Sequence, residues 1–107
     1  MPETMQLSSP FEAFGETVTS VEIREPRGAD YLELGEPRIY SRTPDGSIYA
    51  IHDMPVIKKY LERCVFKSDR RGERIPTVES FMSLADIRKA TMVLLGFFSE
   101  EEKKSPS

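Results

Sequence analysis

The chain has 107 residues, enough for one domain with a buried core but too few for a second core. Apolar residues make up 38% of it and charged residues 31%, a balance typical of a globular protein with a well-solvated surface. The formal net charge of −3 argues against a protein whose main partner is a nucleic-acid backbone, because such proteins are usually basic.

The cysteine count and the apolar pattern indicate in which cellular compartment the protein is expected. A single cysteine excludes an internal disulfide and suits a reducing environment. No apolar run approaches the roughly twenty residues that cross a bilayer, and the first residues lack the basic start and apolar block of a signal peptide. We therefore expect a cytoplasmic protein that does not contact membranes.

The N-terminal quarter is expected to form a flexible arm followed by paired strands. Residues 1–10 carry prolines near both ends and little apolar material, which is typical of a loose segment. A short strand is expected at Phe11–Phe14, followed by a turn and a second strand at Thr17–Glu25, which alternates and is rich in β-branched residues. Val21 and Ile23 would then share one face of that strand.

A short helix and a hairpin are expected next. The pattern of Arg27–Gly35 predicts a helix that Gly35 closes at its C-terminal end. In Arg38–Ile51, two β-prone arms flank the sequence Pro-Asp-Gly at 44–46, which is a strong turn signal. The segment therefore predicts a β-hairpin.

The middle helix should run from Met54 to about Val65, with Asp53 as its N-terminal cap and Pro55 in the first turn, where a missing N–H costs little. A charged loop over Lys67–Pro76 should follow. The short stretch Thr77–Phe81 is expected to add one helical turn. The apolar face of the middle helix would consist of Ile57, Tyr60, Leu61, Cys64 and Val65.

The closing helix is the most informative segment. Ser83 and Asp86 have the spacing of a capping box, so the helix should start at Leu84. Met92, Val93 and Phe97 fall outside its main apolar stripe, so this helix is more apolar than a small domain requires. The surplus surface must meet the core or a partner. The stripe consists of Leu84, Ile87, Thr91, Leu94, Leu95 and Phe98.

These elements together predict an α+β fold, with short antiparallel β-hairpins in a small sheet packed against about three helices, the longest at the C-terminus. Residues 11–99 are expected to form the single domain. Residues 100–107 have the low complexity and charge of a disordered tail.

Candidates for catalysis are few. His52 lies beside Asp53 and could act as a general base oriented by a carboxylate, but an exposed residue at a strand–helix junction is the favoured interpretation. Cys64 lies on an apolar helix face, where an inert buried thiol is expected. One histidine and one cysteine cannot form a finger-like metal cluster, and the chain has neither a glycine-rich phosphate loop nor a G-x-S-x-G turn. We expect no enzyme activity and no cofactor.

A basic cluster lies in the charged loop. It could hold phosphates, which makes a small nucleic-acid-binding regulator the alternative function. Asp69 and Glu73 interrupt it, and no aromatic platform beyond Phe66 is interleaved with it, so a solvated loop is favoured. The same cations could form a charged rim for an acidic protein partner. The cluster consists of Lys67, Arg70, Arg71 and Arg74.

Three segments in order resemble the small tail assembly chaperones of long-tailed bacteriophages. Val18–Leu34 is similar to the family's opening, in which a strand ending in Arg-Glu-Pro precedes small residues, an aspartate and leucines. Val56–Cys64 is similar to its middle helix, and Ser83–Phe98 resembles its closing Ser-Leu-x-Asp helix that ends in Gly-Phe-Phe. The three cover about two-thirds of the chain. The Arg38–Ile51 hairpin departs from the family pattern, because it is longer and more β-like than the short linker expected there.

The resemblance implies a non-enzymatic assembly factor of a phage or prophage. Such proteins bind the helical tape measure protein in the host cytoplasm, keep its apolar surface soluble, and are displaced as tail tube subunits polymerise, so they are not expected in the mature virion. Binding an amphipathic rod requires flexible apolar contacts and a charged rim. Self-association is also compatible with surplus apolar surface. The candidate partner-binding residues are Ile87, Met92, Leu95, Phe97 and Phe98.

Overall fold

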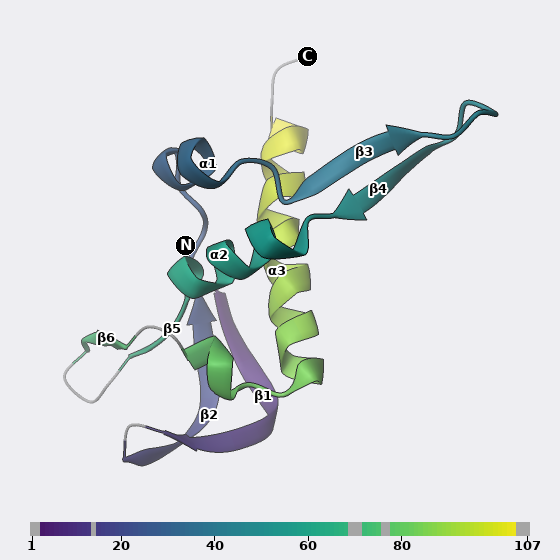
Figure 1. Cartoon of the computed structure of the whole chain (residues 1–107). Coiled ribbons are helices and arrows are strands. Elements are labelled where there is room, and N and C mark those ends of the chain that lie inside the picture. The colour runs from purple at the N-terminus through teal and green to yellow at the C-terminus, as the bar shows by residue number, and fades with distance from the viewer. Residues whose placement is uncertain (1–2, 14, 69–71, 76–77, 105–107) are drawn as a thin grey trace.

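The computed structural model describes residues 3–13, 15–68, 72–75 and 78–104, without the side chains of 78, 79 and 100–104. Within these residues, three α-helices and one 3-10 turn accompany a four-stranded antiparallel sheet and a separate two-stranded hairpin (Figure 1). The longest helix is the last one. This arrangement confirms the α+β fold expected from the sequence.

The main sheet combines two strands from the N-terminus with two strands from beyond the middle of the chain. Strands β1 (Glu3–Ala13) and β2 (Glu16–Ile23) pair in antiparallel fashion, with Gly15 at a positive φ of 77° in the turn between them. Strand β5 (Val65–Ser68) pairs with β2, and β6 (Arg74–Ile75) pairs with β5. Val21 and Ile23 share the buried face, as expected.

The flexible arm expected over residues 1–10 is wrong for residues 3–10, which belong to β1. Met5 and Leu7 alternate with polar residues and are both buried, so this segment has an apolar face despite its low apolar content. Pro10 is tolerated because β1 lies at the edge of the sheet and its pairing with β2 shifts between Gln6 and Phe11.

A buried carboxylate joins that irregular part of β1 to the start of the last helix. Asp86 accepts hydrogen bonds from the backbone N–H and hydroxyl of Ser8, at 2.8 and 2.6 Å, and from the N–H of Ser9 at 3.1 Å. These donors, the Ser8 hydroxyl foremost, lower the pKa of Asp86 to about 2. Asp86 therefore satisfies backbone groups that the shifted pairing leaves without strand partners.

The charged loop expected over Lys67–Pro76 is also partly wrong. Lys67 belongs to β5 and Arg74 to β6, and the two strands pair Lys67 with Ile75. Val65 and Phe66 are buried and hold β5 against β2, so the strand continues directly from the preceding helix.

The first two helices follow the sequence expectations closely. Helix α1 (Gly28–Leu34) ends at Gly35, which has a positive φ of 83° that favours glycine. Helix α2 (Met54–Cys64) begins after Asp53, whose carboxylate accepts the N–H of Val56 at 3.3 Å.

The C-terminal part is more ordered than expected. The 3-10 turn η1 (Val78–Phe81) precedes helix α3 (Leu84–Lys104), and the Ser83 hydroxyl accepts the N–H of Asp86 at 3.2 Å as an N-terminal cap. Residues 100–104, expected in a disordered tail, continue the helix. The remaining tail residues, 105–107, lie outside the described part of the chain.

The core lies between the main sheet and helices α2 and α3 (Figure 1). Tyr60 lies at its centre, and its hydroxyl donates to the carbonyl of Gly35 at 2.6 Å while its ring meets Phe98 edge-on, with centroids 5.3 Å apart. Burial raises the pKa of Tyr60 to about 12. The other buried members include Val18, Val21, Ile23, Ile57, Leu61, Cys64, Val65, Ala90, Leu94 and Phe97.

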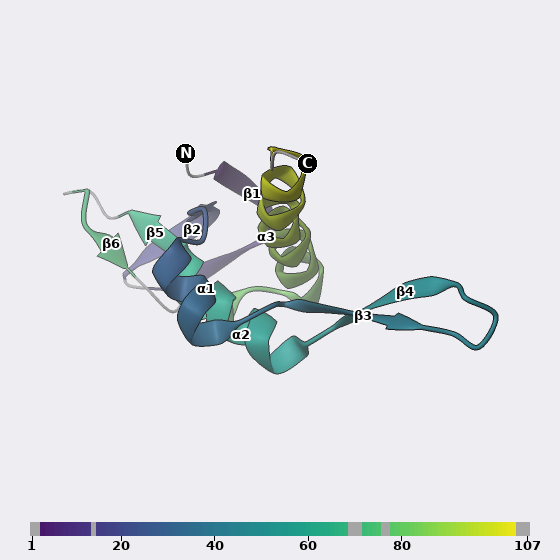
Figure 2. The same ribbon diagram turned by 90° about the horizontal axis from the view of Figure 1, so that it is seen from above.

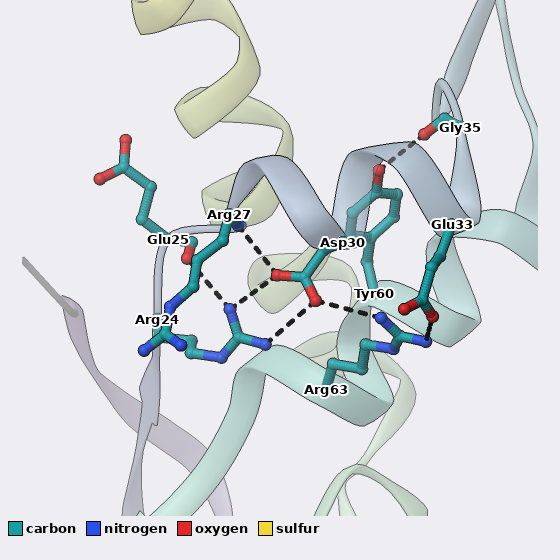
Figure 3. Close-up of polar contacts among 8 residues, drawn as sticks. All are labelled: Arg24, Glu25, Arg27, Asp30, Glu33, Gly35, Tyr60 and Arg63. Atoms are coloured by element: carbon teal, nitrogen blue, oxygen red, sulfur yellow. Dashed lines mark hydrogen bonds and ion pairs between the residues drawn. The ribbon is translucent and has the colours of Figure 1, made fainter.

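An ionic network ties α1 to β2 and α2 (Figure 3). The carboxylate of Asp30 accepts from the Arg24 guanidinium at 2.9 Å, from the backbone N–H of Arg27 at 2.9 Å, and from Arg63 at 3.1 Å. Arg63 also donates to Glu33 at 2.5 Å. The Arg24 hydrogen bond, more than any other contact, lowers the pKa of Asp30 well below its usual range.

Candidate functional site

A two-stranded hairpin projects from the folded body and carries five of the large apolar residues that are exposed in the described chain. Strand β3 (Arg38–Arg42) pairs with β4 (Ile48–His52), with Ile39 opposite Ile51 and Tyr40 opposite Ala50. Both views show the hairpin extending well clear of the helices and of the main sheet (Figure 1, Figure 2). The hairpin expected from the sequence is confirmed, but its isolation was not anticipated.

The turn at the tip is closed by local hydrogen bonds. The N–H of Thr43 donates to the carbonyl of Ser47 at 2.8 Å, and Gly46 has a positive φ of 93°. The Asp45 carboxylate accepts the hydroxyl of Thr43 and the N–H of Ser47, contacts that lower its pKa. The Pro-Asp-Gly signal therefore specifies a defined turn and fixes the register of both strands.

Both faces of the hairpin carry exposed apolar side chains. Alternation along the strands puts Ile39, Tyr49 and Ile51 on one face, together with Ser41; we call these four residues the isoleucine face. The opposite face carries Tyr40 and Ile48, with Arg38, Arg42, Ala50 and His52. The five large apolar residues, Ile39, Tyr40, Ile48, Tyr49 and Ile51, are each between 45% and 63% exposed.

The base of the hairpin is anchored to the folded body by hydrogen bonds, whereas the rest of the hairpin extends away from it (Figure 1). The N–H of Asp53 donates to the carbonyl of Pro37 at 2.9 Å, and the Arg38 guanidinium donates to the Ser99 hydroxyl of α3 at 3.1 Å. Asp53 also caps α2, so β4 leads directly into a buried helix. A two-stranded hairpin without further packing is at best marginally stable in water, so this one is suited to gaining stability from a partner.

The apolar surplus of α3 is mostly absorbed by the core. Leu95 and Phe97 are 4% and 7% exposed, and Ile87 and Phe98 are half-buried against the core cluster. Met92, at 66% exposed, is the one member of the proposed partner-binding set that is largely accessible. The structure therefore does not bring these five residues together as a binding surface.

Two of the four predicted rim cations are engaged. Lys67 forms an ion pair with Glu16, and the Arg74 guanidinium lies 4.3 Å from the centre of the Phe66 ring. Arg70 and Arg71 lie outside the described residues. Lys67 and Arg74, the described members of the cluster, are therefore both engaged in contacts within the main sheet.

The residues with catalytic potential are not assembled into a site. His52 is exposed at the end of β4, while the Asp53 carboxylate serves the α2 cap. Burial raises the pKa of the Cys64 thiol to about 11, which keeps it in the unreactive thiol form. Over residues 3–13, 15–68, 72–75 and 78–104, no group of His, Cys, Asp and Glu side chains is placed to hold a metal ion.

The exposure of the hairpin was not predicted from the sequence, because the β-prone residues of its two arms were interpreted only as a sign of strand pairing. A signal was present in the adjacent pairs Ile39–Tyr40 and Ile48–Tyr49, since neighbouring residues in a strand face opposite ways. The two strands of a hairpin lie side by side, so neither strand covers the apolar residues on either face. Such a pattern in a short hairpin therefore indicates exposed apolar surface.

The remaining observations concern the helices and the similarity of the chain to known proteins. No helix within the described residues has the length and apolar character needed to cross a membrane. No family model, curated protein or solved structure matches the chain.

Proposed function

We propose that the protein is a non-enzymatic assembly chaperone that binds the tape measure protein of a long-tailed phage in the host cytoplasm and keeps it soluble. The exposed hairpin is the observation that carries this proposal. Five large apolar side chains stand in solvent on a structure with a defined register and an anchored base. Exposed apolar side chains gathered on one element in this way usually mark a protein-binding site.

The shape of the hairpin fits an elongated helical client. The isoleucine face offers a strip of Ile39, Tyr49 and Ile51, against which the apolar stripe of an amphipathic helix can lie. Arg38 and Arg42 project from the opposite face at its two ends and leave the strip itself uncharged. Such a contact is apolar enough to hold a client and small enough to be displaced when tail tube subunits assemble on it.

The sequence resemblance supplies the identity of the client, and the surface supports the kind of binding that the resemblance implies. The alternative of a nucleic-acid-binding regulator gains no support from the described cations. Lys67 is paired with Glu16, and Arg74 is stacked on Phe66. A site for phosphates would instead require unpaired cations gathered on one face.

Co-expression with a tape measure protein of a long-tailed phage tests the proposal. We expect the chain to raise the soluble fraction of the tape measure protein several-fold over an empty vector. The variant I39T/Y49T/I51T, which keeps β-prone residues on the isoleucine face, should lose most of that effect because the apolar strip is removed.

M92Q serves as the matched control, because Met92 is exposed to a similar extent on α3. It should solubilise the tape measure protein as well as the wild type does. If the wild-type chain leaves the soluble fraction unchanged, the proposed function is wrong. If M92Q fails and the hairpin variant works, the function stands but the binding site lies on α3.

A further inference from the structure

The outer edge of β4 is an unpaired strand edge. The N–H of Asp53 bonds to Pro37 and the N–H of Thr43 bonds to Ser47, so odd-numbered residues of the hairpin form its internal hydrogen-bonded pairs. The even-numbered residues Ile48, Ala50 and His52 therefore direct their backbone N–H and C=O groups away from β3. The described part of the chain supplies no partner for these groups.

This edge lacks the features that usually prevent strands from pairing between molecules. Natural edge strands are protected by lysine, proline, bulges or a covering element. Strand β4 reads Ile-Tyr-Ala-Ile-His, with no proline, no lysine or arginine and no bulge, and all five of its residues are exposed. It also stands apart from the helices in both views (Figure 1, Figure 2).

We propose that β4 pairs with β4 of a second copy of this chain, in antiparallel fashion about a two-fold axis at Ala50. Ala50 then faces its own copy, and Ile48 faces His52 of the other chain. All three of these residues direct their hydrogen-bonding groups outward, so the register gives hydrogen-bonded pairs at each position. The hairpins become one four-stranded sheet, with the two folded bodies at its opposite ends.

The side chains on the isoleucine face support the same register. Tyr49 lies opposite Ile51 of the second copy in a non-hydrogen-bonded pair, where side chains approach closely, and aromatic with β-branched pairs are favourable there. The two isoleucine faces join into one continuous surface that carries Ile39, Tyr49 and Ile51 twice. The dimer therefore doubles the apolar area available to a client by widening the sheet from two strands to four.

Charge selects the β4 edge over the β3 edge. The same two-fold pairing through β3, centred on Tyr40, would put Arg38 directly opposite Arg42 of the second copy, and would do so twice. Like charges directly opposite each other in a sheet are destabilising. Strand β3 also begins against α3, through the Arg38–Ser99 hydrogen bond. A second copy therefore fits β4 better than β3.

Sedimentation of the purified chain alone tests this proposal, which does not depend on the proposed client. The weight-average mass should rise from 12.2 kDa toward twice that value as concentration increases to about 1 mM, a range in which even weak dimers form. A chain that stays at 12.2 kDa throughout overturns the proposal. A mass that keeps rising beyond the dimer also overturns it, because it indicates open-ended pairing of β3 with β4.

Matched edge variants identify the strand. A50P removes an N–H that points outward, so the hairpin itself keeps its hydrogen bonds, and the dimer dissociation constant should rise at least about tenfold. A50K, which places two lysines opposite each other, should weaken the dimer in the same way without a proline. Y40P makes the equivalent change at the β3 edge and should leave the constant within about twofold. A constant unchanged in both Ala50 variants would overturn the proposal.

Discussion

Replacing Phe97 by Ala is expected to lower the free energy of unfolding by about 3–5 kcal/mol. The Phe97 side chain is 7% exposed and belongs to the core cluster formed by α2, α3 and the sheet. Its removal leaves a cavity that the surrounding side chains can fill only in part. Urea unfolding followed by far-ultraviolet circular dichroism measures the change.

Met92 provides the control on the same helix. It is 66% exposed, so M92A should change the free energy of unfolding by no more than about 0.5 kcal/mol. Equal effects of F97A and M92A would contradict the assignment of Phe97 to the core. They would also reopen the sequence-based hypothesis that the end of α3 is a binding surface.

The second large effect is expected at Asp30. The D30A substitution should cost about 3 kcal/mol at neutral pH, because it leaves the mostly buried Arg24 guanidinium without its anion. It also removes the acceptor of the Arg27 N–H and of one Arg63 donor. The E33A substitution removes only an exposed contact with Arg63 and should cost no more than about 1 kcal/mol.

Acid distinguishes this account of Asp30 from a simple loss of packing. The pKa of Asp30 is lower in the folded chain than its ordinary value of 3.8, with the Arg24 hydrogen bond as the main cause. Its contribution is therefore complete above the unfolded pKa and is lost as pH falls through the folded pKa. The difference between wild type and D30A should shrink when unfolding is measured below pH 3.8; a constant difference would indicate that the charge is not responsible.

Elements with local signals were predicted well from the sequence. Gly35 closes α1, Asp53 caps α2 and Ser83 caps α3, and each of these signals lies within a few residues of the boundary that it sets. The turn at residues 44–46 likewise fixed the hairpin register. Such features depend on backbone hydrogen bonds between near neighbours, so the sequence alone is sufficient.

Elements that depend on distant partners were predicted poorly. Strand β1 is held by β2 and by the Asp86 carboxylate, which lies 78 residues from Ser8 in sequence. Strands β5 and β6 form inside a charged segment because Phe66 is buried beside β2. No local pattern reveals such contacts, so both segments were expected to be irregular.

The candidate site illustrates the same limit. The periodicity of α3 correctly identified a helix with apolar residues on several sides, but it could not tell whether strands or solvent would meet them. Leu95 and Phe97 are buried in the folded chain, while the hairpin, whose pattern looked ordinary, is exposed. Whether a side chain is exposed depends on how many elements pack around its segment, and this is a property of the whole fold.

Isoleucine methyl spectra of the purified chain, recorded with and without the tape measure protein, test the central claim most directly, because the isoleucines report on each region separately. On adding the client, the methyl signals of Ile39 and Ile51 on the isoleucine face should shift or broaden more than that of Ile48 on the opposite face, while that of buried Ile57 stays in place. Shifts confined to Ile87 of α3, with the three hairpin signals unchanged, would contradict the assignment of the hairpin as the binding surface.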